Sequence, residues 1–278
     1  MHLPSIAAGT TIASLLRNPG IDPFDARILL GDALGLSRVQ LITHSEYALN
    51  DVEAQRAASL FGRRAEGEPV AYILGEREFY GLSFHVTPDV LIPRPETELL
   101  IDLALDRAPA DARVLDMGTG SGVLAVTLAH LRSDFAVTAL DVNEAALVVA
   151  RLNADRHNVN INLLRSDWYR MLGAETFELI VANPPYIMEN DPHLSQGDLR
   201  YEPCDALTDH ADGLSAIRII VAGASAHLAP GGWLLLEHGY DQSASVRTLL
   251  NESGFEEVQS WKDLAGIERA SGGRLRSK

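Results

Sequence analysis

Short apolar runs alternate with segments of helical length over the second part of the chain. The runs occur in "RVLDMGTGSG", "AVTALDVN", "INLLRSDW", "FELIVANPPY" and "GWLLLEHG". Apolar runs of this length are typical of buried strands, and their alternation with helices is typical of α/β folds. The pattern predicts a doubly wound, mostly parallel sheet.

The first part of the chain has a different period. From Thr10 to about Gly67, apolar residues recur at three- and four-residue spacing, which predicts a small helical bundle. "EFYGLSFHV" then alternates around a glycine, which indicates a β-hairpin, and "TPDVLIPRPETE" is rich in proline. We therefore expect a helical domain over 1–74, a hairpin and proline-rich linker over 75–95, and an α/β domain over 96–278.

Composition and charge restrict the class of partner. The 278-residue chain has a net charge of −15, which should repel a phosphate backbone, so a nucleic-acid substrate is disfavoured. No apolar run is long enough to cross a bilayer, and "MHLPSIAAGTTIASLL" lacks the features of a secretory signal. The single Cys204 fits a reducing compartment. We expect a cytoplasmic protein with no membrane partner, no bound metal and no catalytic role for Cys204.

The run "VLDMGTGSGVLAVTLA" has the order strand, glycine turn, helix, with alternating Gly118, Gly120 and Gly122. Glycines at this spacing allow a tight turn and let a ligand approach the backbone without a Cβ in the way. Neither the dinucleotide motif nor the P-loop motif is completed, since position 123 is Val. The run therefore indicates a ligand for which phosphate is not the first choice, and a purely structural turn is the alternative.

Two further strand ends favour a ligand at this loop. Asp141 ends "VTALD", where a carboxylate can accept hydrogen bonds from both ribose hydroxyls of a nucleoside. Asp167 and Trp168 end "LLRSDW" and offer an acceptor and a flat wall for adenine, although a buried Trp alone is by default core. An adenosine pocket without a phosphate clamp points to S-adenosyl-L-methionine. The order of motifs resembles class I methyltransferases that act on planar amino or amide nitrogens.

The tetrad "NPPY" follows the fourth of these runs. Its two prolines fix φ and remove two backbone donors where the chain leaves the sheet. We expect the side-chain oxygen of Asn183 and the backbone carbonyl of Pro184 each to accept one N–H of a substrate NH₂ group, with Tyr186 holding that group in line. A general base is not needed before transfer. A strand-terminating Pro-Pro turn is the alternative, but it leaves the Asn and the Tyr unexplained.

From end to end, the chain resembles the bacterial peptide chain release factor glutamine methyltransferases. The matching stretches are "GEPVAYILGEREFYGLSFHV", "LIPRPETE", "LDMGTGSG", "NPPYI", "DPHLSQGDLRYEP", "LLEHGY" and "AGIERASGGR". The resemblance implies a helical N-terminal domain that binds the partner, a hairpin linker and a methyltransferase domain. It also implies methyl transfer to N5 of the glutamine in the Gly-Gly-Gln motif of class 1 release factors, leaving S-adenosyl-L-homocysteine.

The resemblance further implies roles for individual residues. The glycine loop would hold the methionine end of the cofactor, Asp141 the ribose and Trp168 the adenine. The tetrad would hold the substrate glutamine, with Asn183 also near the cofactor. The candidate site is Gly118, Thr119, Gly120, Ser121, Gly122, Asp141, Trp168, Asn183, Pro184, Pro185 and Tyr186. Arg94 and Glu96 are possible contacts that would equally suit a linker or a helix cap, and Phe79 and Tyr80 of the hairpin could grip the partner or pack in a core.

Three other functions stay open on these residues. A ribosomal-protein glutamine methyltransferase would share the tetrad, but "LIPRPETE" favours the release-factor group. An amino-methyltransferase of DNA or RNA would also share it, and the acidic charge argues against that. A catalytically silent adenosine-binding protein would have no reason to keep the tetrad intact.

Overall fold

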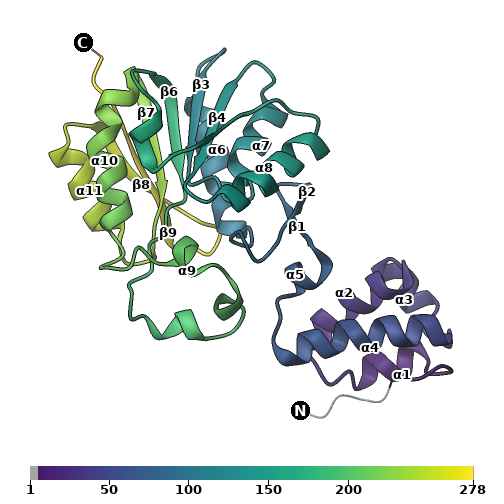
Figure 1. The fold of residues 1–278 in the computed structure, drawn as a ribbon. Coiled ribbons are helices and arrows are strands. Elements are labelled where there is room, and N and C mark those ends of the chain that lie inside the picture. Colours follow the sequence, from purple (N-terminus) through teal and green to yellow (C-terminus); the bar gives the residue numbers. More distant parts are fainter. Residues whose placement is uncertain (1–5, 278) are drawn as a thin grey trace. The chain divides into compact units, whose positions relative to one another are not determined.

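The computed structural model describes residues 6–277, and Figure 1 shows their fold. Residues 1–5, which belong to the N-terminal stretch considered above as a secretory signal, lie outside the described part, as does residue 278. The chain divides into two compact units, Met1–Glu76 and Arg77–Lys278. In the described part, no helix combines the length and apolar character that a membrane crossing requires.

The first unit is a bundle of short helices with well-defined ends. Ser37 with Gln40, and Asn50 with Glu53, form capping boxes in which each side chain bonds the other residue's backbone N–H. Its core includes the fully buried side chains of Leu29 and Phe61. The helices are α1 (Ile12–Arg17), α2 (Pro23–Leu34), α3 (Arg38–Thr43), α4 (Asp51–Glu66) and α5 (Val70–Leu74).

The second unit is built on a seven-stranded sheet of order β5-β4-β3-β6-β7-β9-β8. The neighbouring pairs from β5 to β7 are parallel, and β9 is antiparallel to both of its neighbours. The strands are β3 (Arg113–Met117), β4 (Ala136–Asp141), β5 (Asn162–Arg165), β6 (Phe177–Ala182), β7 (Leu228–Glu237), β8 (Glu256–Lys262) and β9 (Glu268–Arg274). The predicted doubly wound, mostly parallel α/β fold is confirmed.

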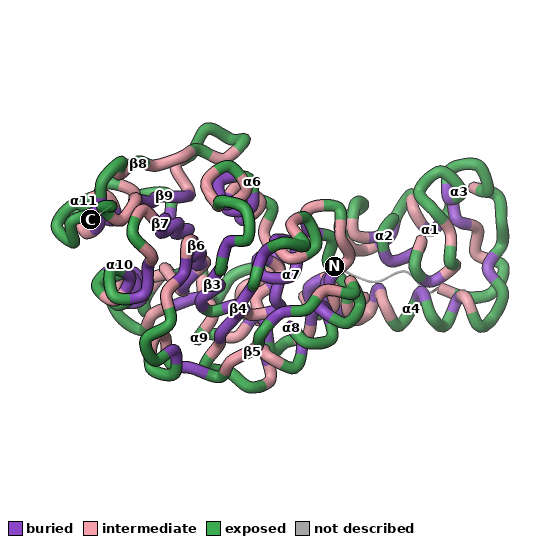
Figure 2. The backbone as a smooth tube through the Cα atoms, turned by 90° about the horizontal axis from the view of Figure 1, so that it is seen from above, coloured by how far each residue is buried: buried purple, intermediate pink, exposed green. Residues whose placement is uncertain are grey.

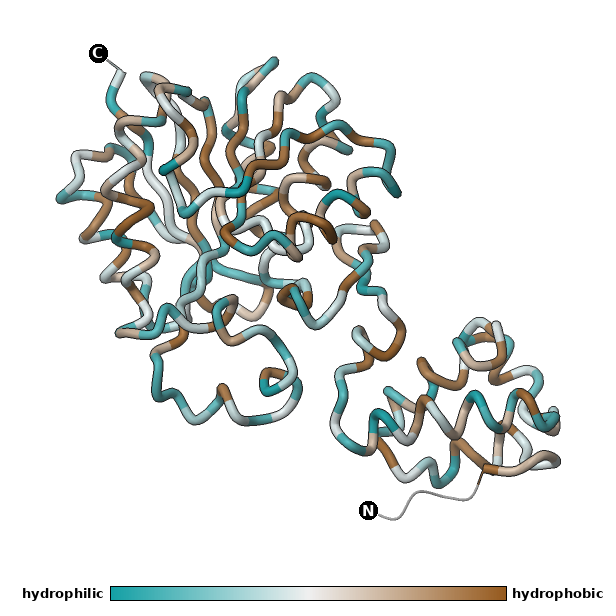
Figure 3. The backbone as a smooth tube through the Cα atoms, in the orientation of Figure 1, coloured by the Kyte–Doolittle hydropathy of each residue, from teal (hydrophilic) through white to brown (hydrophobic). Residues whose placement is uncertain are grey.

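Helices cover both faces of this sheet, because neighbouring residues of a buried strand point to opposite sides. In β3, Val114 belongs to the core beneath one helical layer and Leu115 to the core beneath the other. Figure 1 shows α10 and α11 on one side and α6, α7 and α8 on the other. The central strands are mostly buried (Figure 2) and mostly hydrophobic (Figure 3). The helices are α6 (Glu98–Arg107), α7 (Val123–Leu131), α8 (Glu144–Arg156), α10 (Ser215–His227) and α11 (Ser243–Glu252), with the single turn α9 (Cys204–Leu207) before α10.

The predicted hairpin is present as β1 (Glu76–Phe79) and β2 (Leu82–His85). Phe79 and Phe84 are buried in a core cluster of the second unit, so their side chains face the protein interior. The Tyr80 hydroxyl donates to Asp102 Oδ1 at 2.8 Å. Phe79 and Phe84 therefore pack inside the domain, whereas Tyr80 is half-buried and its hydroxyl is bonded near the surface.

A buried side chain, Asn153 of α8, attaches this hairpin to the glycine loop. Its Oδ1 accepts from the backbone N–H of His85 at 2.7 Å, and its Nδ2 donates to the carbonyl of His85 at 2.9 Å and to that of Ser121 at 2.8 Å. The Asn153 amide thus holds hairpin, helix and loop together.

The strand order reverses between β3 and β6. The chain proceeds from β3 outward to β4 and β5 and then returns to pair β6 on the other side of β3. In open α/β sheets, ligands bind outside the carboxyl ends of the strands at such a switch point. The glycine loop after β3, Asp141 at the end of β4 and Asn183 after β6 meet at this edge.

Candidate active site

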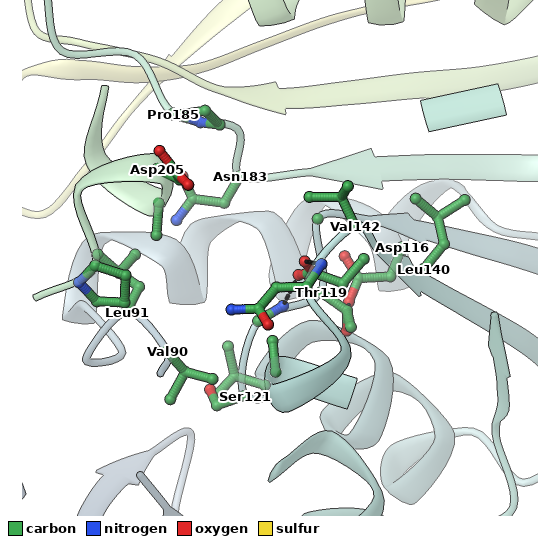
Figure 4. A pocket seen from close by; sticks show the side chains of 18 of the residues that line it. Val90, Leu91, Asp116, Thr119, Ser121, Leu140, Val142, Asn183, Pro185 and Asp205 are labelled. Carbon is green, nitrogen blue, oxygen red and sulfur yellow. Dashed lines mark hydrogen bonds between the residues drawn. The ribbon is translucent and has the colours of Figure 1, made fainter. Parts of the chain in front are cut away.

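A cavity of about 630 Å³ lies at the switch point, a size typical of small-molecule sites. Figure 4 shows Asn183, Pro185 and Asp205 on one side of it, with Thr119 and Ser121 at some distance from them. Most of the predicted site lines this cavity: Gly118, Thr119, Gly120, Ser121, Asp141, Trp168, Asn183 and Pro185. Gly122, Pro184 and Tyr186 are not among the described residues that line it.

The three loop glycines serve different physical needs. Gly118 and Gly120 have φ of +71° and +54°, and a Cβ on either would meet no protein atom within 4 Å. They therefore give the loop its left-handed turns and leave its backbone open on the cavity side. Gly122 has a φ of +84° as well, and it also approaches α8, where its Cβ would lie 3.1 Å from the Cβ of Ala150. The absence of a side chain here lets the start of α7 pack closely on α8.

Asp141 fastens the glycine loop to the neighbouring strand. Its Oδ2 accepts from the backbone N–H of Gly120 at 2.9 Å, and its Oδ1 accepts from that of Asn143, also at 2.9 Å. Burial raises the pKa of Asp141, and these backbone hydrogen bonds oppose the rise. Each carboxylate oxygen keeps capacity for a further donor, so Asp141 can also accept from ligand hydroxyls.

Asp116 is a site residue that the sequence interpretation missed. It is 1% exposed and lines the cavity, and its Oδ2 accepts from Thr119 Oγ1 at 2.6 Å and from the backbone N–H of Ala125 at 3.2 Å. Its Oδ1 has no hydrogen-bond partner in the described part of the chain. Burial raises the pKa of Asp116 to about 7. A single carboxylate inside the apolar run "VLDMG" was the available signal.

Trp168 lines the cavity from a position beyond its strand. The sequence interpretation ended the strand at Asp167 and Trp168, whereas β5 ends at Arg165 and Trp168 begins a short 3₁₀ turn with φ of +49°. The Ser166 hydroxyl stabilises this turn, because it donates to the Trp168 carbonyl at 2.6 Å and accepts from the N–H of Met171 at 3.1 Å. A left-handed Trp is rare, and such strain gathers at functional sites.

Asn183 follows the last residue of β6 and is half-buried. Its Nδ2 donates to Thr97 Oγ1 at 3.2 Å, whereas its Oδ1 accepts no hydrogen bond from the described residues. Pro184 is buried beside it. The amide thus has its nitrogen occupied by the protein and its oxygen available to a ligand.

Tyr186 supports the tetrad from behind. Its ring packs against the core beneath α10 and α11, its hydroxyl donates to Glu237 Oε1 at 3.1 Å, and its backbone carbonyl accepts from Gln242 Nε2 at 2.9 Å. Contact with a substrate was the expectation for this ring. Its position instead suits it to fixing the path of the two prolines.

The proline-rich segment contributes a wall that the sequence interpretation left out. Val90, Leu91, Pro93, Arg94 and Thr97 line the cavity, whereas Glu96 is exposed and does not line it in the described structure. The Arg94 guanidinium pairs with Glu202, whose side chain is fully buried and also accepts from the N–H of Ile92 at 2.9 Å. This ion pair joins the segment to the loop that follows the tetrad, so both segments are held at the cavity.

Two family models match the chain. The model of a methyltransferase small domain matches residues 95–196, and that of a PrmC N-terminal domain matches residues 10–75. Among solved structures, a methyltransferase from Pyrococcus furiosus superimposes with a TM-score of 0.55 at 21% identity, covering 80% of this chain and 100% of that one. A T. thermophilus 16S rRNA methyltransferase solved with AdoMet and guanosine has a TM-score of 0.54 at 21% identity, covering 72% of this chain and 50% of that one. These likenesses establish the class I methyltransferase fold.

Curated relatives are similar over nearly the whole length. The release factor glutamine methyltransferase of Burkholderia pseudomallei is 56% identical over 274 residues, which are 95% of this chain and 96% of that protein. The protein of the same name from Pseudomonas aeruginosa is 46% identical over 272 residues, 95% of this chain and 99% of that protein. With this identity over both units, and with a cavity lined by the glycine loop, Asn183 and Pro185, the chain belongs to the release factor glutamine methyltransferases.

Proposed function

We propose that this enzyme transfers a methyl group from S-adenosyl-L-methionine to the side-chain amide nitrogen, N5, of the glutamine in the Gly-Gly-Gln motif of class 1 release factors. The observation that carries the proposal is the position of Asn183. Its amide lines the same cavity as the glycine loop and Asp141, with its oxygen available to a ligand. Family membership supplies the substrate class.

The charged groups that line the cavity suit a positively charged nucleoside. Arg94 is the one Arg or Lys among the described residues that line it, and it is paired with Glu202, so no phosphate clamp is offered. The unpartnered Oδ1 of Asp116 suits a positively charged group of the ligand. We assign the methionine end to Asp116 and the loop from Gly118 to Gly122, the ribose to Asp141 and the adenine to Trp168. When bound, S-adenosyl-L-methionine supplies a methyl group made electrophilic by a positively charged sulfur and is left as S-adenosyl-L-homocysteine.

The substrate glutamine is held by acceptors alone. Its NH₂ group donates one hydrogen to Asn183 Oδ1 and the other to the Pro184 carbonyl. An amide nitrogen becomes more positive as its new bond forms, so rigid acceptors stabilise the transition state more than the ground state. The prolines and the anchored Tyr186 keep that pair of acceptors in place with little reorganisation. One proton leaves the nitrogen after transfer, so the site needs no base with a matched pKa.

The helical domain, residues 1–74, is the part to which we assign binding of the release factor, with residues 75–95 joining it to the methyltransferase domain, residues 96–278. The acidic charge of the chain favours a protein partner over nucleic acid. This assignment keeps recognition of the partner separate from the chemistry at the cavity.

Transfer of labelled methyl from S-adenosyl-L-methionine to a purified class 1 release factor tests the proposal. Label should appear on the factor and be absent from a variant with Gly-Gly-Ala in place of Gly-Gly-Gln. Ribosomal protein and DNA serve as parallel substrates. Label on either of these and none on the release factor would replace the substrate while keeping the chemistry.

A further inference from the structure

Gln242 connects the tetrad to two other segments through its side-chain amide. Its Nε2 donates to the carbonyl of Tyr186 at 2.9 Å and to that of Gly213 at 3.1 Å. Its Oε1 accepts from the backbone N–H of Gly239 at 2.8 Å. These partners lie in the turn after β6, in the loop before α10 and in the turn after β7. One half-buried side chain therefore joins three segments that are far apart in the sequence.

The partners of this amide fix its orientation. A carbonyl only accepts and a backbone N–H only donates, so the nitrogen of Gln242 must face Tyr186 and Gly213. Its oxygen must then face Gly239, and both hydrogens of the NH₂ group are used. Gln242 also occupies the N-cap position of α11, yet its side chain does not cap that helix. The side chain instead bonds the tetrad and its neighbours.

A glycine brings the loop before α10 into close contact with the same groups. Gly213 has a φ of +79°, and a Cβ on it would lie 2.5 Å from the Tyr186 carbonyl oxygen and 2.8 Å from Gln242 Nε2. These separations are shorter than van der Waals contact, so a side chain at this position would displace the carbonyl or the amide. The loop therefore packs directly on the end of the tetrad.

The two prolines make the Tyr186 carbonyl important for the path of the tetrad. Pro184 and Pro185 have no N–H to donate, so hydrogen bonds can hold this turn only through its carbonyl oxygens and its flanking residues. One residue, Pro185, separates the carbonyl of Pro184 from that of Tyr186, and its ring fixes φ. A displacement of the Tyr186 carbonyl is therefore passed on to the Pro184 carbonyl, because rotation about that bond cannot absorb it.

We propose that Gln242 is a positioning residue for methyl transfer, which anchors the Tyr186 carbonyl and thereby holds the Pro184 carbonyl where it accepts from the substrate NH₂ group. This role rests on the proposed function, in which that carbonyl is one of two acceptors. Gln242 and Gly213 are not among the described residues that line the cavity, so neither is expected to touch the substrate or the cofactor. Their effect should appear in turnover and not in cofactor binding.

Two substitutions of Gln242 test this role. Gln242→Met keeps the length of the side chain and removes all three hydrogen bonds. Gln242→Glu keeps an oxygen for Gly239 but places a carboxylate against two carbonyls. We expect kcat on the release factor to fall at least about tenfold in both, because a small displacement of a group that orients the substrate is costly. The dissociation constant for S-adenosyl-L-methionine should change less than about twofold, since the cavity wall is intact. Gln259→Met is the matched control, because Gln259 is exposed on β8, and its kcat should equal that of wild type.

Gly213→Ala tests the same contact from the opposite side. The new methyl group should displace the Tyr186 carbonyl, so kcat should again fall at least about tenfold with cofactor affinity unchanged. Gly254→Ala is its matched control. Gly254 has a similar φ of +82°, but a Cβ there would meet no protein atom within 4 Å, so this variant has the backbone strain without the displacement. Its kcat should stay within about twofold of wild type.

The outcomes separate the positioning role from the proposed function. If Gln242→Met and Gly213→Ala turn over normally while Asn183→Ala is inactive, the positioning role is wrong and the proposed function stands. Parallel loss of cofactor binding and kcat in both variants would make the contact a general support of the fold, which also overturns the inference. Absence of label on the release factor with the wild-type enzyme would instead refute the proposed function.

Discussion

Asn183 has an acceptor end and a donor end, and methyl transfer to an amide nitrogen requires the acceptor end to meet the substrate. The nitrogen of Asn183 is held 3.2 Å from Thr97 Oγ1, so a ligand meets the oxygen. The orientation of the Asn183 amide that the transfer requires is therefore already present before any substrate binds.

Asn183→Ala removes this acceptor and should lower kcat by about 10²-fold or more, the usual cost of losing one preorganised hydrogen bond in a transition state. Binding of S-adenosyl-L-methionine, measured by calorimetry, should be largely kept because Asp141 and the glycine loop are intact. Pro185→Ala is a useful comparison, since it changes the rigidity of the turn without deleting an acceptor. Near-normal turnover by Asn183→Ala would remove this residue from the mechanism.

Asp116 should make cofactor affinity dependent on pH. Its pKa is raised to about 7 by burial, so the carboxyl gains a proton as pH falls through that value. A positively charged ligand favours the ionised form, and affinity should therefore weaken toward a limiting slope of about tenfold per pH unit below pH 7. Asp116→Asn should bind more weakly at pH 8 and show a flat profile between pH 5.5 and 8. Calorimetric titration across this range measures both. An equal slope in the two proteins would assign the pH dependence to another group.

At the scale of residues, a side chain could be placed in the site from the sequence when it directly follows a buried strand. Gly118, Asp141 and Asn183 follow buried strands directly, and strand ends converge at a switch point, so their meeting could be predicted. The hydrogen bond between Thr97 and Asn183 joins a turn to a residue 86 positions later, and nothing local marks Thr97 as a partner of Asn183. Trp168 was expected at a strand end, and a local Ser hydroxyl moved it into a turn.

At the scale of elements, the parallel strands were predictable and the antiparallel edge was not. "LIVA" in β6 and "WLLL" in β7 are continuous apolar runs because helices cover both faces of these strands. "EEVQSWK", which forms β8, is rich in polar and charged residues because β8 lies at the edge of the sheet and is largely exposed. "ERASGGR", which forms β9, is mostly buried but has small residues, and a Cβ on its Gly272 would lie 2.5 Å from the carbonyl of Leu234. Such strands carry little signal of their own and form through pairing with β7.

The hairpin depends on one buried side chain of α8. Asn153→Leu would leave the backbone groups of His85 and the carbonyl of Ser121 without their partner, so the free energy of unfolding should fall by about 2 to 3 kcal/mol. Urea denaturation followed by circular dichroism measures the loss. Asn251→Leu is the matched control, because that Asn is exposed and donates to one carbonyl of its own helix, and its effect should stay within about 0.5 kcal/mol. Equal losses in the two variants would show that Asn153 has no special role.

At the scale of the molecule, the described residues that line the cavity all belong to the second unit, Arg77–Lys278. That unit has its own two hydrophobic cores, one on each face of the sheet. A protein consisting of residues 77–278 should therefore bind S-adenosyl-L-methionine with a dissociation constant within about threefold of that of the full chain. It should methylate the release factor far more slowly. If the helical domain supplies the binding surface for the release factor, the loss should appear as a higher KM. Calorimetry and initial rates separate the two effects. Full methylation by the shortened protein would show that the helical domain is not needed for recognition.

Because the Asn153 amide bonds both the hairpin and the glycine loop, hydrogen exchange in the hairpin should respond to a ligand bound in the cavity. The His85 N–H, which donates to Asn153 Oδ1, can exchange its hydrogen with solvent only when this attachment opens, and the same side chain holds the carbonyl of Ser121. A ligand that immobilises the glycine loop makes that opening rarer. Deuterium uptake at the hairpin should therefore slow when the cofactor binds, although the hairpin contributes no residue to the wall of the cavity.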